Sequence, residues 1–328
     1  MKTIALIGDG IAAQAFLFTY YQERLHKDFE LTQFYAPDRA PAVTESSTAI
    51  VALRGVELGV SELGDKIFQS YVDFKNFVSH AKPQGVELIK HSTCWATDFE
   101  NDQKYSKRFP NFEVRGQTKY YEEEAFLIYP TQLSASLKKP FTHRRQEALV
   151  KNLQWQDNQW QVQTHDIEKF DYVLVCAGAY SPWLLNDERT QKTKPAQGSF
   201  LVWKLDKKLS SFALSFEEIN VIYREKTQEL ILGSTTMDNG YSFIPEINKL
   251  QKLYQKYADH FQPDFLPAFE AAKIITGLRH KGPKRLPYWG AAPIGPQAYQ
   301  IDSFYKNGWS FAFSAALGIV KILKTLDV

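Results

Sequence analysis

Cysteine is scarce in this chain, which has only Cys94 and Cys176 among its 328 residues. The two do not form a CxxC pair, so neither a disulfide framework nor a thiolate zinc site is indicated. Free thiols are typical of proteins in a reducing compartment, and we therefore expect a cytoplasmic protein. No HExxH or comparable metal motif is present, and we expect no metal.

A strong charge of one sign and long apolar runs are lacking too. The net charge is +2, too small an imbalance to indicate a nucleic-acid-binding protein by itself. No apolar segment reaches transmembrane length, so we expect no membrane partner. The apolar stretch from Lys2 to Tyr21 is interrupted at Gly8 and Gly10 and lacks a small-x-small cleavage site, so we expect no export signal. The number of subunits is not indicated.

The first 35 residues predict a βαβ unit. Residues 3–7 and 31–35 are short apolar runs typical of buried parallel strands. Residues 11–25, between them, have apolar side chains at spacings of three and four, as in a helix. Because the glycine turn at 8–10 joins the first strand to this helix, the segment predicts the start of a parallel sheet.

The rest of the chain mixes helices with strands that alternate like an antiparallel sheet. Asp157 and Asn158 form the turn of a predicted hairpin, and Ser314 is the expected N-cap of the last helix. The predicted helices are 61–81, 251–261 and 315–326, and the predicted strands are 149–153, 160–164, 171–176, 200–205, 220–223 and 229–232.

Gly8-x-Gly10-x-x-Ala13 matches the fingerprint of dinucleotide-binding proteins. The first glycine permits the tight turn, the second lets backbone N–H groups approach a pyrophosphate, and the small third residue lets helix and strand pack closely. An ordinary glycine turn is the alternative. The position of the motif directly after a strand and before a helix favours a dinucleotide.

One part of the fingerprint is missing. An Asp or Glu normally ends the second strand and holds the ribose hydroxyls, but Tyr35 stands there. Asp38, three residues further on, is a possible substitute, although a solvated loop acid is the simpler interpretation. Arg39 would instead favour a 2′-phosphate and hence NADP.

Four segments together resemble a known family. IALIGDGIAAQA, DYVLVCAGAYSPWL, ITGLRHKGPKRLPYWG and NGWSFAFSAALGIVKIL occur in the order seen in the D-amino-acid oxidase and glycine oxidase superfamily of FAD enzymes. Within it, the chain most resembles the FAD-dependent C-terminal domain of the bifunctional bacterial enzymes that make 5-methylaminomethyl-2-thiouridine in tRNA. The shared features are the Ala40-Pro41-Ala42 tripeptide and a polar loop, Glu45-Ser46-Ser47-Thr48.

The resemblance implies FAD as cofactor and an α/β (α+β) fold, with a Rossmann-like FAD-binding domain of GR2 type and an inserted, mostly antiparallel β substrate domain. Residues 1–80, 140–195 and 270–328 would form the first domain, and residues 81–139 and 196–269 the second. The expected cofactor-binding residues are Gly8, Gly10, Ala13, Tyr35, Ser46, Ser47, Thr48, Leu149, Ala177, Gly178, Ser314, Ala315 and Ala316.

Arg279 matches the arginine that the family aims at a substrate carboxylate, and its planar fork suits bidentate pairing with both oxygens. A structural salt bridge is the alternative role. The family's substrate-facing tyrosine falls on Val221, and Tyr223, two residues away on the same strand face, is the expected replacement. The family's acid before Leu286-Pro287 is absent, because Lys284 and Arg285 stand there. The family's glycine-rich loop before the last helix is shortened here to residues 312–314.

Three functions follow from these residues. The first is an FAD-dependent oxidoreductase that oxidises a C–N bond of an amino acid or N-substituted glycine by hydride transfer to flavin, on a small substrate with a carboxylate. The second removes the carboxymethyl group from a tRNA wobble uridine, which the basic stretch RHKGPKR at 279–285 favours. The third is a non-catalytic nucleotide- or partner-binding protein on the same fold. His280 as a general base has little support.

Overall fold

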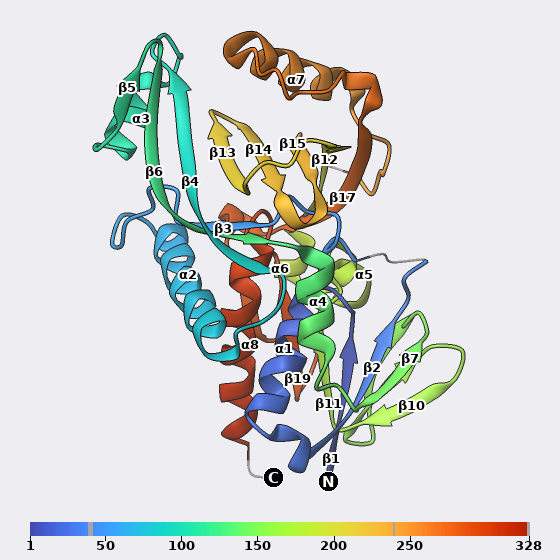
Figure 1. The fold of residues 1–328 in the computed structure, drawn as a ribbon. Helices are drawn as coiled ribbons and strands as arrows, with labels where there is room; N and C mark the ends of the chain where they lie inside the picture. Colours follow the sequence, from blue (N-terminus) through green and yellow to red (C-terminus); the bar gives the residue numbers. More distant parts are fainter. Residues whose placement is uncertain (39–41, 239, 327–328) are drawn as a thin grey trace.

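A six-stranded sheet forms one end of the molecule, shown at the bottom of Figure 1. The computed structural model describes residues 1–38, 42–238 and 240–326. Five strands of this sheet are parallel, and only the edge strand β18 is antiparallel to its neighbour. Its strands, in spatial order, are β18 (Tyr288–Ala291), β19 (Ala298–Asp302), β11 (Tyr172–Val175), β1 (Lys2–Ile7), β2 (Phe29–Tyr35) and β7 (Arg144–Glu147).

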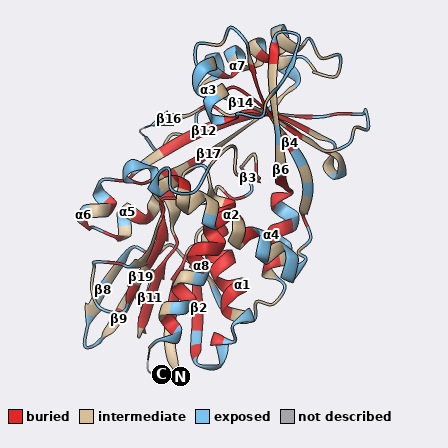
Figure 2. Ribbon diagram, turned by 90° about the vertical axis from the view of Figure 1, so that its left-hand side faces the viewer, coloured by how far each residue is buried: buried red, intermediate tan, exposed pale blue. Residues whose placement is uncertain are grey.

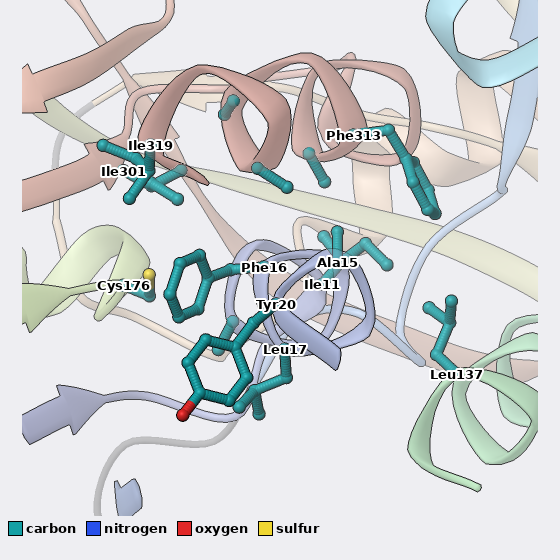
Figure 3. Packing of buried hydrophobic residues seen from close by; sticks show 14 of the residues in the cluster. Ile11, Ala15, Phe16, Leu17, Tyr20, Leu137, Cys176, Ile301, Phe313 and Ile319 are labelled. Atoms are coloured by element: carbon teal, nitrogen blue, oxygen red, sulfur yellow. The ribbon is translucent and has the colours of Figure 1, made fainter. Parts of the chain in front are cut away.

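Helix α1 (Ile11–Gln22) connects β1 to β2 and forms the predicted βαβ unit with them. Most of its side chains are buried, because α8 (Gly308–Lys324) packs along it. Figure 3 shows Phe16 and Tyr20 of α1 in the same apolar cluster as Ile319 of α8. Burying large apolar side chains of this kind contributes about 1.5–3 kcal/mol each, so the helix pair stabilises the β1–α1 turn.

The second sheet is larger and mostly antiparallel, with one parallel pair, β13 and β4. Helix α7 (Ile247–Phe261) covers the face turned away from the first sheet (Figure 1). The strands are β16 (Met237–Asp238), β12 (Lys194–Lys204), β15 (Glu229–Gly233), β14 (Ile219–Arg224), β13 (Phe212–Phe216), β4 (Val86–Ala96), β6 (Thr118–Ile128) and β3 (Ile50–Ala52), with β17 (Lys273–Lys281) beside β12 and β5 (Glu113–Arg115) beside β6.

A three-stranded sheet, β8 (Asn152–Gln156), β9 (Gln159–Gln163) and β10 (Ile167–Phe170), packs Trp160 and Val162 onto the first sheet. The predicted Asp157-Asn158 turn is confirmed: both residues have positive φ, as a two-residue type I′ hairpin turn requires. The remaining helices are α2 (Glu62–Ala81), α3 (Asp102–Arg108), α4 (Pro130–Lys138), α5 (Ser181–Leu184) and α6 (Glu188–Gln191). Short 3-10 turns lie at Leu25–Lys27, Gly178–Tyr180, Glu225–Thr227, Phe269–Ala271 and Pro283–Arg285.

The last helix begins earlier than the sequence pattern indicates. It starts at Gly308, with Asn307 as N-cap, so the predicted start at 315 is wrong. Trp309 and Phe311 are buried in the core that α1 and α8 share, and this packing makes the first turns of α8 helical. The predicted domain boundaries stay a prediction, although α4, placed in the second domain, packs against α1 of the first.

Burial is greatest in the parallel strands and in α1 and α8 (Figure 2). Cys94 and Cys176 are both free and buried. Burial raises the pKa of both thiols, so they are unreactive at neutral pH. Within the described residues, no helix is long and apolar enough to cross a bilayer.

Candidate FAD and substrate site

A cavity of about 450 Å³ lies at the carboxyl ends of the parallel strands β1, β2, β11 and β19. Ligands of open parallel sheets bind at this edge, where the strand ends and following loops leave a crevice. One end of the cavity is apolar and lies next to Phe34, Leu149 and Val150. The other end lies against the second sheet at Arg279 and Tyr305. The cavity therefore joins the two large sheets.

The glycine turn forms one wall of this cavity. Gly8 has a φ of +125°, and a Cβ on it would lie 2.4 Å from the carbonyl oxygen of Cys176, so no other residue fits there. Gly10 precedes α1, whose first-turn N–H groups have no partner within the helix. Ala13 does not line the cavity, but it is fully buried and lets α1 lie close to the sheet.

Thr44 is a site residue that the sequence pattern did not single out. Its Oγ1 accepts a hydrogen bond of 2.7 Å from the backbone N–H of Ile11, at the beginning of α1, and Thr44 lines the cavity. It directly precedes the polar loop that contains the expected residues Ser46, Ser47 and Thr48. Nothing in the local sequence distinguishes one hydroxyl from the others, because the contact joins residues 33 positions apart.

Ser46, Ser47 and Thr48 do not line the cavity; at least two of them hold the loop in place. The hydroxyl of Ser47 donates to the carbonyl of Thr44 at 2.9 Å and accepts from the indole of Trp309 at 3.0 Å. The buried guanidinium of Arg224 donates to the carbonyl of Thr48 at 3.0 Å. The loop that carries Thr44 is therefore anchored to both α8 and the second sheet.

Tyr35, at the end of β2, lines the cavity as expected. The guanidinium of Arg145 lies 4.4 Å from the centre of its ring, a cation–π contact. Asp38, the possible substitute for the missing acid, is exposed and does not line the cavity. Arg39 and the Ala40-Pro41 step lie outside the described residues.

Leu149 and the turn residues Ala177 and Gly178 line the cavity where the resemblance placed them. Gly178 has a φ of +55° and begins a short 3-10 turn after β11. Ser314, Ala315 and Ala316 do not line it, and their expected place at the start of the last helix is wrong. They are buried inside α8. Gly308, at the true start of α8, lines the cavity instead.

Arg279 lies on β17 at the inner end of the cavity, with its guanidinium packed over the backbone of Gly198. Its Nη2 donates to the hydroxyl of Ser234 at 2.8 Å, and Nη1 makes longer contacts of 3.4–3.5 Å to Thr236 and the carbonyl of Thr235. No carboxylate of the described residues pairs with it. Burial lowers the pKa of this guanidinium below its ordinary value, so the charge is poorly compensated within the chain.

Tyr223 does not face the cavity, so its expected role as a substrate-facing residue is wrong. Its ring is fully buried beneath α7, and its hydroxyl donates to the carbonyl of Lys207. Val221 lies on the same face of the second sheet as Tyr223, because side chains two residues apart in a strand point the same way. That face points away from the cavity. Tyr305, in the loop after β19, is the tyrosine that lines the cavity together with Arg279.

His280 and Asp302 form a buried polar wall near Arg279. Asp302 accepts hydrogen bonds from Arg189 and Ser303, each at 2.7 Å. The Nδ1 atom of His280 accepts from the backbone N–H of Ser303 at 3.4 Å, and its Nε2 has no partner. Burial lowers the pKa of His280, so the ring is neutral at pH 7.

The residues present fit a dinucleotide. The turn at Gly8 leaves no room for a side chain where the backbone approaches β11, and the start of α1 offers N–H groups to a phosphate. Phe34, Leu149 and Val150 give the far end an apolar lining suited to an adenine ring. Within the described residues, no cluster of His, Cys, Asp or Glu could hold a metal ion.

Comparison with known proteins assigns the class. The model of the family "DAO: FAD dependent oxidoreductase" matches residues 99–321, which is more than half of the chain. The chain therefore belongs to the DAO family, and it is an FAD-dependent oxidoreductase. No curated protein matches it by sequence.

Solved structures of similar fold include amine and amino-acid oxidases. Glycine oxidase from Geobacillus kaustophilus has a TM-score of 0.79 at 13% identity, covering 100% of this chain and 96% of that chain. Iminodiacetate oxidase from Chelativorans sp. BNC1 has a TM-score of 0.81 at 12% identity, covering 99% and 96%. Glycine oxidase from Bacillus cereus has a TM-score of 0.77 at 13% identity, covering 99% and 95%. These likenesses confirm the expected fold class.

Proposed function

We propose that this enzyme oxidises a C–N bond of an amino acid or N-substituted glycine. The observation that carries the proposal is Arg279, a partly buried guanidinium at the inner end of the cavity, whose partners among the described residues are two hydroxyls and a carbonyl. A substrate carboxylate would supply the missing anion through a bidentate pair. The likeness to glycine oxidases and iminodiacetate oxidase supports a substrate of this kind.

The reaction removes two electrons from the substrate. A C–H bond next to nitrogen breaks as hydride leaves, the nitrogen loses a proton to solvent, and a C=N bond forms. FAD supplies the hydride acceptor. Water then adds to the imine and releases a carbonyl compound and an amine. The chain's part is to hold the carboxylate on Arg279, so that the reacting carbon is positioned in the cavity.

Tyr305 and the apolar lining have supporting roles in this proposal. Tyr305 lines the cavity together with Arg279, and its hydroxyl would hydrogen-bond a substrate oxygen or nitrogen. The apolar side chains around Phe34 and Val150 keep water from the far end. The neutral state of His280 fits a reaction in which amine oxidation needs little acid–base help from the protein.

The spectrum of the purified protein tests this proposal first. A two-band flavin spectrum is expected, and the long-wavelength band should bleach without oxygen when glycine, N-methylglycine or a D- or L-amino acid is added. Arg279→Met should keep the spectrum but bleach slowly and without saturation. A colourless protein that does not take up FAD, or a yellow protein that no amine in the panel reduces, would contradict the proposal.

A nucleotide-borne substrate is the second candidate, favoured by one feature of the surface. Lys284 and Arg285 are exposed, and Trp183, 59% exposed, stands at the edge of the cavity beside Tyr180. Exposed cations and exposed aromatic rings are both features of RNA-binding surfaces. RNA-dependent turnover that is lost on charge reversal at Lys284 and Arg285 would support this candidate.

The third alternative, a non-catalytic protein, depended partly on a shortened loop before the last helix. Because α8 begins at Gly308, that argument for a non-catalytic protein is lost.

A further inference from the structure

Two further cations lie near Arg279: Lys306 is beside Tyr305 of the cavity wall, and Arg54 is close enough for its charge to act on Lys306. Arg54 follows β3, and Lys306 is the residue after Tyr305 in the loop that leads to α8. Neither side chain pairs with a carboxylate of the described residues, and neither lines the cavity itself. Three cations that make no ion pair with the described residues thus lie close to one another, and one of them, Arg279, lines the cavity.

Lys306 and Lys281 lie against the same tyrosine ring but differ in their ion pairs. The ammonium groups of Lys281 and Lys306 each lie 5.5 Å from the centre of the Tyr305 ring. Lys281 is paired with Asp238, whereas Lys306 has no anionic partner among the described residues. Partial burial, and then the charges of Arg279, Arg54 and Arg285, lower the pKa of Lys306 to about 8, although its side chain reaches solvent. These cations are therefore near enough to repel one another.

The backbone of Arg54 is held by a hydrogen bond, whereas its guanidinium makes none with the described residues. Its backbone N–H donates to Oε1 of Glu123 at 2.6 Å. Its side chain makes no hydrogen bond or ion pair with the described part of the chain. Burial, and then the charge of Arg108, lowers the pKa of this guanidinium. Burying a cation without a partner is unfavourable, so the arrangement is expected to persist where a ligand supplies the anion.

We propose that the substrate carries a second anionic group, which Arg54 and Lys306 bind while Arg279 holds the carboxylate next to the reacting carbon. One carboxylate satisfies the fork of Arg279 and leaves the other two cations without a partner. A dianion such as an N-(carboxyalkyl)glycine gives each of the three cations an anionic partner, with its outer group extending past Tyr305. The inference rests on the proposed function and narrows it to amines with two acidic groups.

Matched pairs of amines test this inference in the FAD-loaded enzyme. N-ethylglycine and N-(2-carboxyethyl)glycine differ chiefly in the second carboxylate, as do N-methylglycine and iminodiacetate. We expect kcat/KM to be about 10- to 100-fold higher for the diacid of each pair. In Lys306→Met and Arg54→Met this ratio should fall by about 10-fold each. Lys208→Met, an exposed lysine in the β12–β13 loop, should leave the ratio unchanged.

Binding of unreactive acids gives a readout that does not depend on turnover. Succinate should perturb the flavin spectrum at lower concentration than butyrate in the parent enzyme, and equally to butyrate in Lys306→Met. A yellow enzyme that oxidises N-methylglycine but shows no preference for the diacid in either experiment would overturn the inference and leave the proposed function intact. If no amine is oxidised, the proposed function fails; tighter binding of succinate would then still support the cation site, and equal binding would overturn it.

Discussion

The two ends of the cavity differ in how their charges are satisfied. Near the glycine turn, the carboxylate of Asp9 pairs with Lys138 at 3.1 Å and Arg145 at 3.2 Å, and it accepts a hydrogen bond from Gln33. At the other end, Arg279, Arg54 and Lys306 make no ion pair with the described residues, and only the more distant charges of Glu123 and Asp238 act on Arg54 and Lys306. Charges that are paired within the chain stabilise the fold, whereas unpaired charges are available to pair with a ligand. The first end fits the cofactor, and we propose that the second binds a substrate anion.

Substitution of Gly8 should break the cofactor end completely. In Gly8→Ala, the new Cβ would lie 2.4 Å from the Cys176 carbonyl oxygen at a φ of +125°, so the turn must shift. We expect loss of bound flavin and a decrease of about 2–4 kcal/mol in the free energy of unfolding. Gly59→Ala is the control, because Gly59 also has positive φ but nothing lies within 4 Å of its Cβ position. Flavin content and thermal unfolding measure both; equal effects in the two variants would contradict the steric account.

Substitution of Arg279 should disable the substrate end alone. Arg279→Met removes the partly buried cation that binds the carboxylate, and kcat/KM for N-methylglycine should fall by about 100- to 1000-fold, or roughly 3–4 kcal/mol. The bound flavin should be retained. Arg279→Lys should recover little activity, because a lysine lacks the planar fork. Steady-state rates with an artificial electron acceptor measure the effect. Activity within a factor of about three of the parent would rule out the assigned role.

Arg224 anchors the loop that carries Thr44 to the second sheet, and its loss should have a smaller effect. It is more buried than Arg279, and it donates to the carbonyl groups of Ser47 and Thr48, in the loop that carries Thr44. Arg224→Met should lower the free energy of unfolding by about 1–3 kcal/mol and weaken flavin retention. Arg115→Met, an exposed residue paired with Glu113, should change stability by less than about 0.5 kcal/mol. Denaturant unfolding compares them, and equal losses would contradict the anchoring role.

The smallest expected effect is a dependence on pH at the substrate end. The pKa of Lys306 is lowered to about 8 by partial burial and by Arg279, Arg54 and Arg285, against an opposing effect of Asp238. Below pH 8 the ammonium is charged and binds the second anion; above it the charge is lost. The preference for a diacid should therefore decline by a few-fold as pH rises from about 7 to about 9. Lys306→Arg should remove the decline, because arginine stays protonated; a decline that persists would assign the titration to another group.

Local patterns predicted much of the framework. The β1–α1–β2 unit follows from two apolar runs and a glycine turn, and the Asp157-Asn158 hairpin from its turn residues. Both features depend on residues that are close in sequence, so they can be predicted without knowledge of the tertiary structure. The glycine motif likewise predicted where the cavity lies, because the carboxyl ends of parallel strands meet at one edge.

The errors concern contacts between distant segments. Tyr223 was assigned to the correct face relative to Val221, but the strand pattern cannot tell which face α7 covers. The start of α8 was missed because Gly308-Trp309 looks like a turn, and only packing in the core makes it helical. Thr44 and Tyr305 come to the cavity through loops whose paths depend on the second sheet. Sequence patterns therefore could not predict the site residues whose positions depend on tertiary contacts.

The central claim is that this enzyme oxidises an amine whose carboxylate is held by Arg279. The most direct measurement is rapid mixing of the yellow enzyme with N-methylglycine and with iminodiacetate in the absence of oxygen, following the flavin absorbance. The account predicts reduction whose rate saturates with substrate concentration in the parent enzyme, and slow reduction without saturation in Arg279→Met. Reduction that saturates equally in both proteins, or a parent enzyme that neither amine reduces, would contradict it.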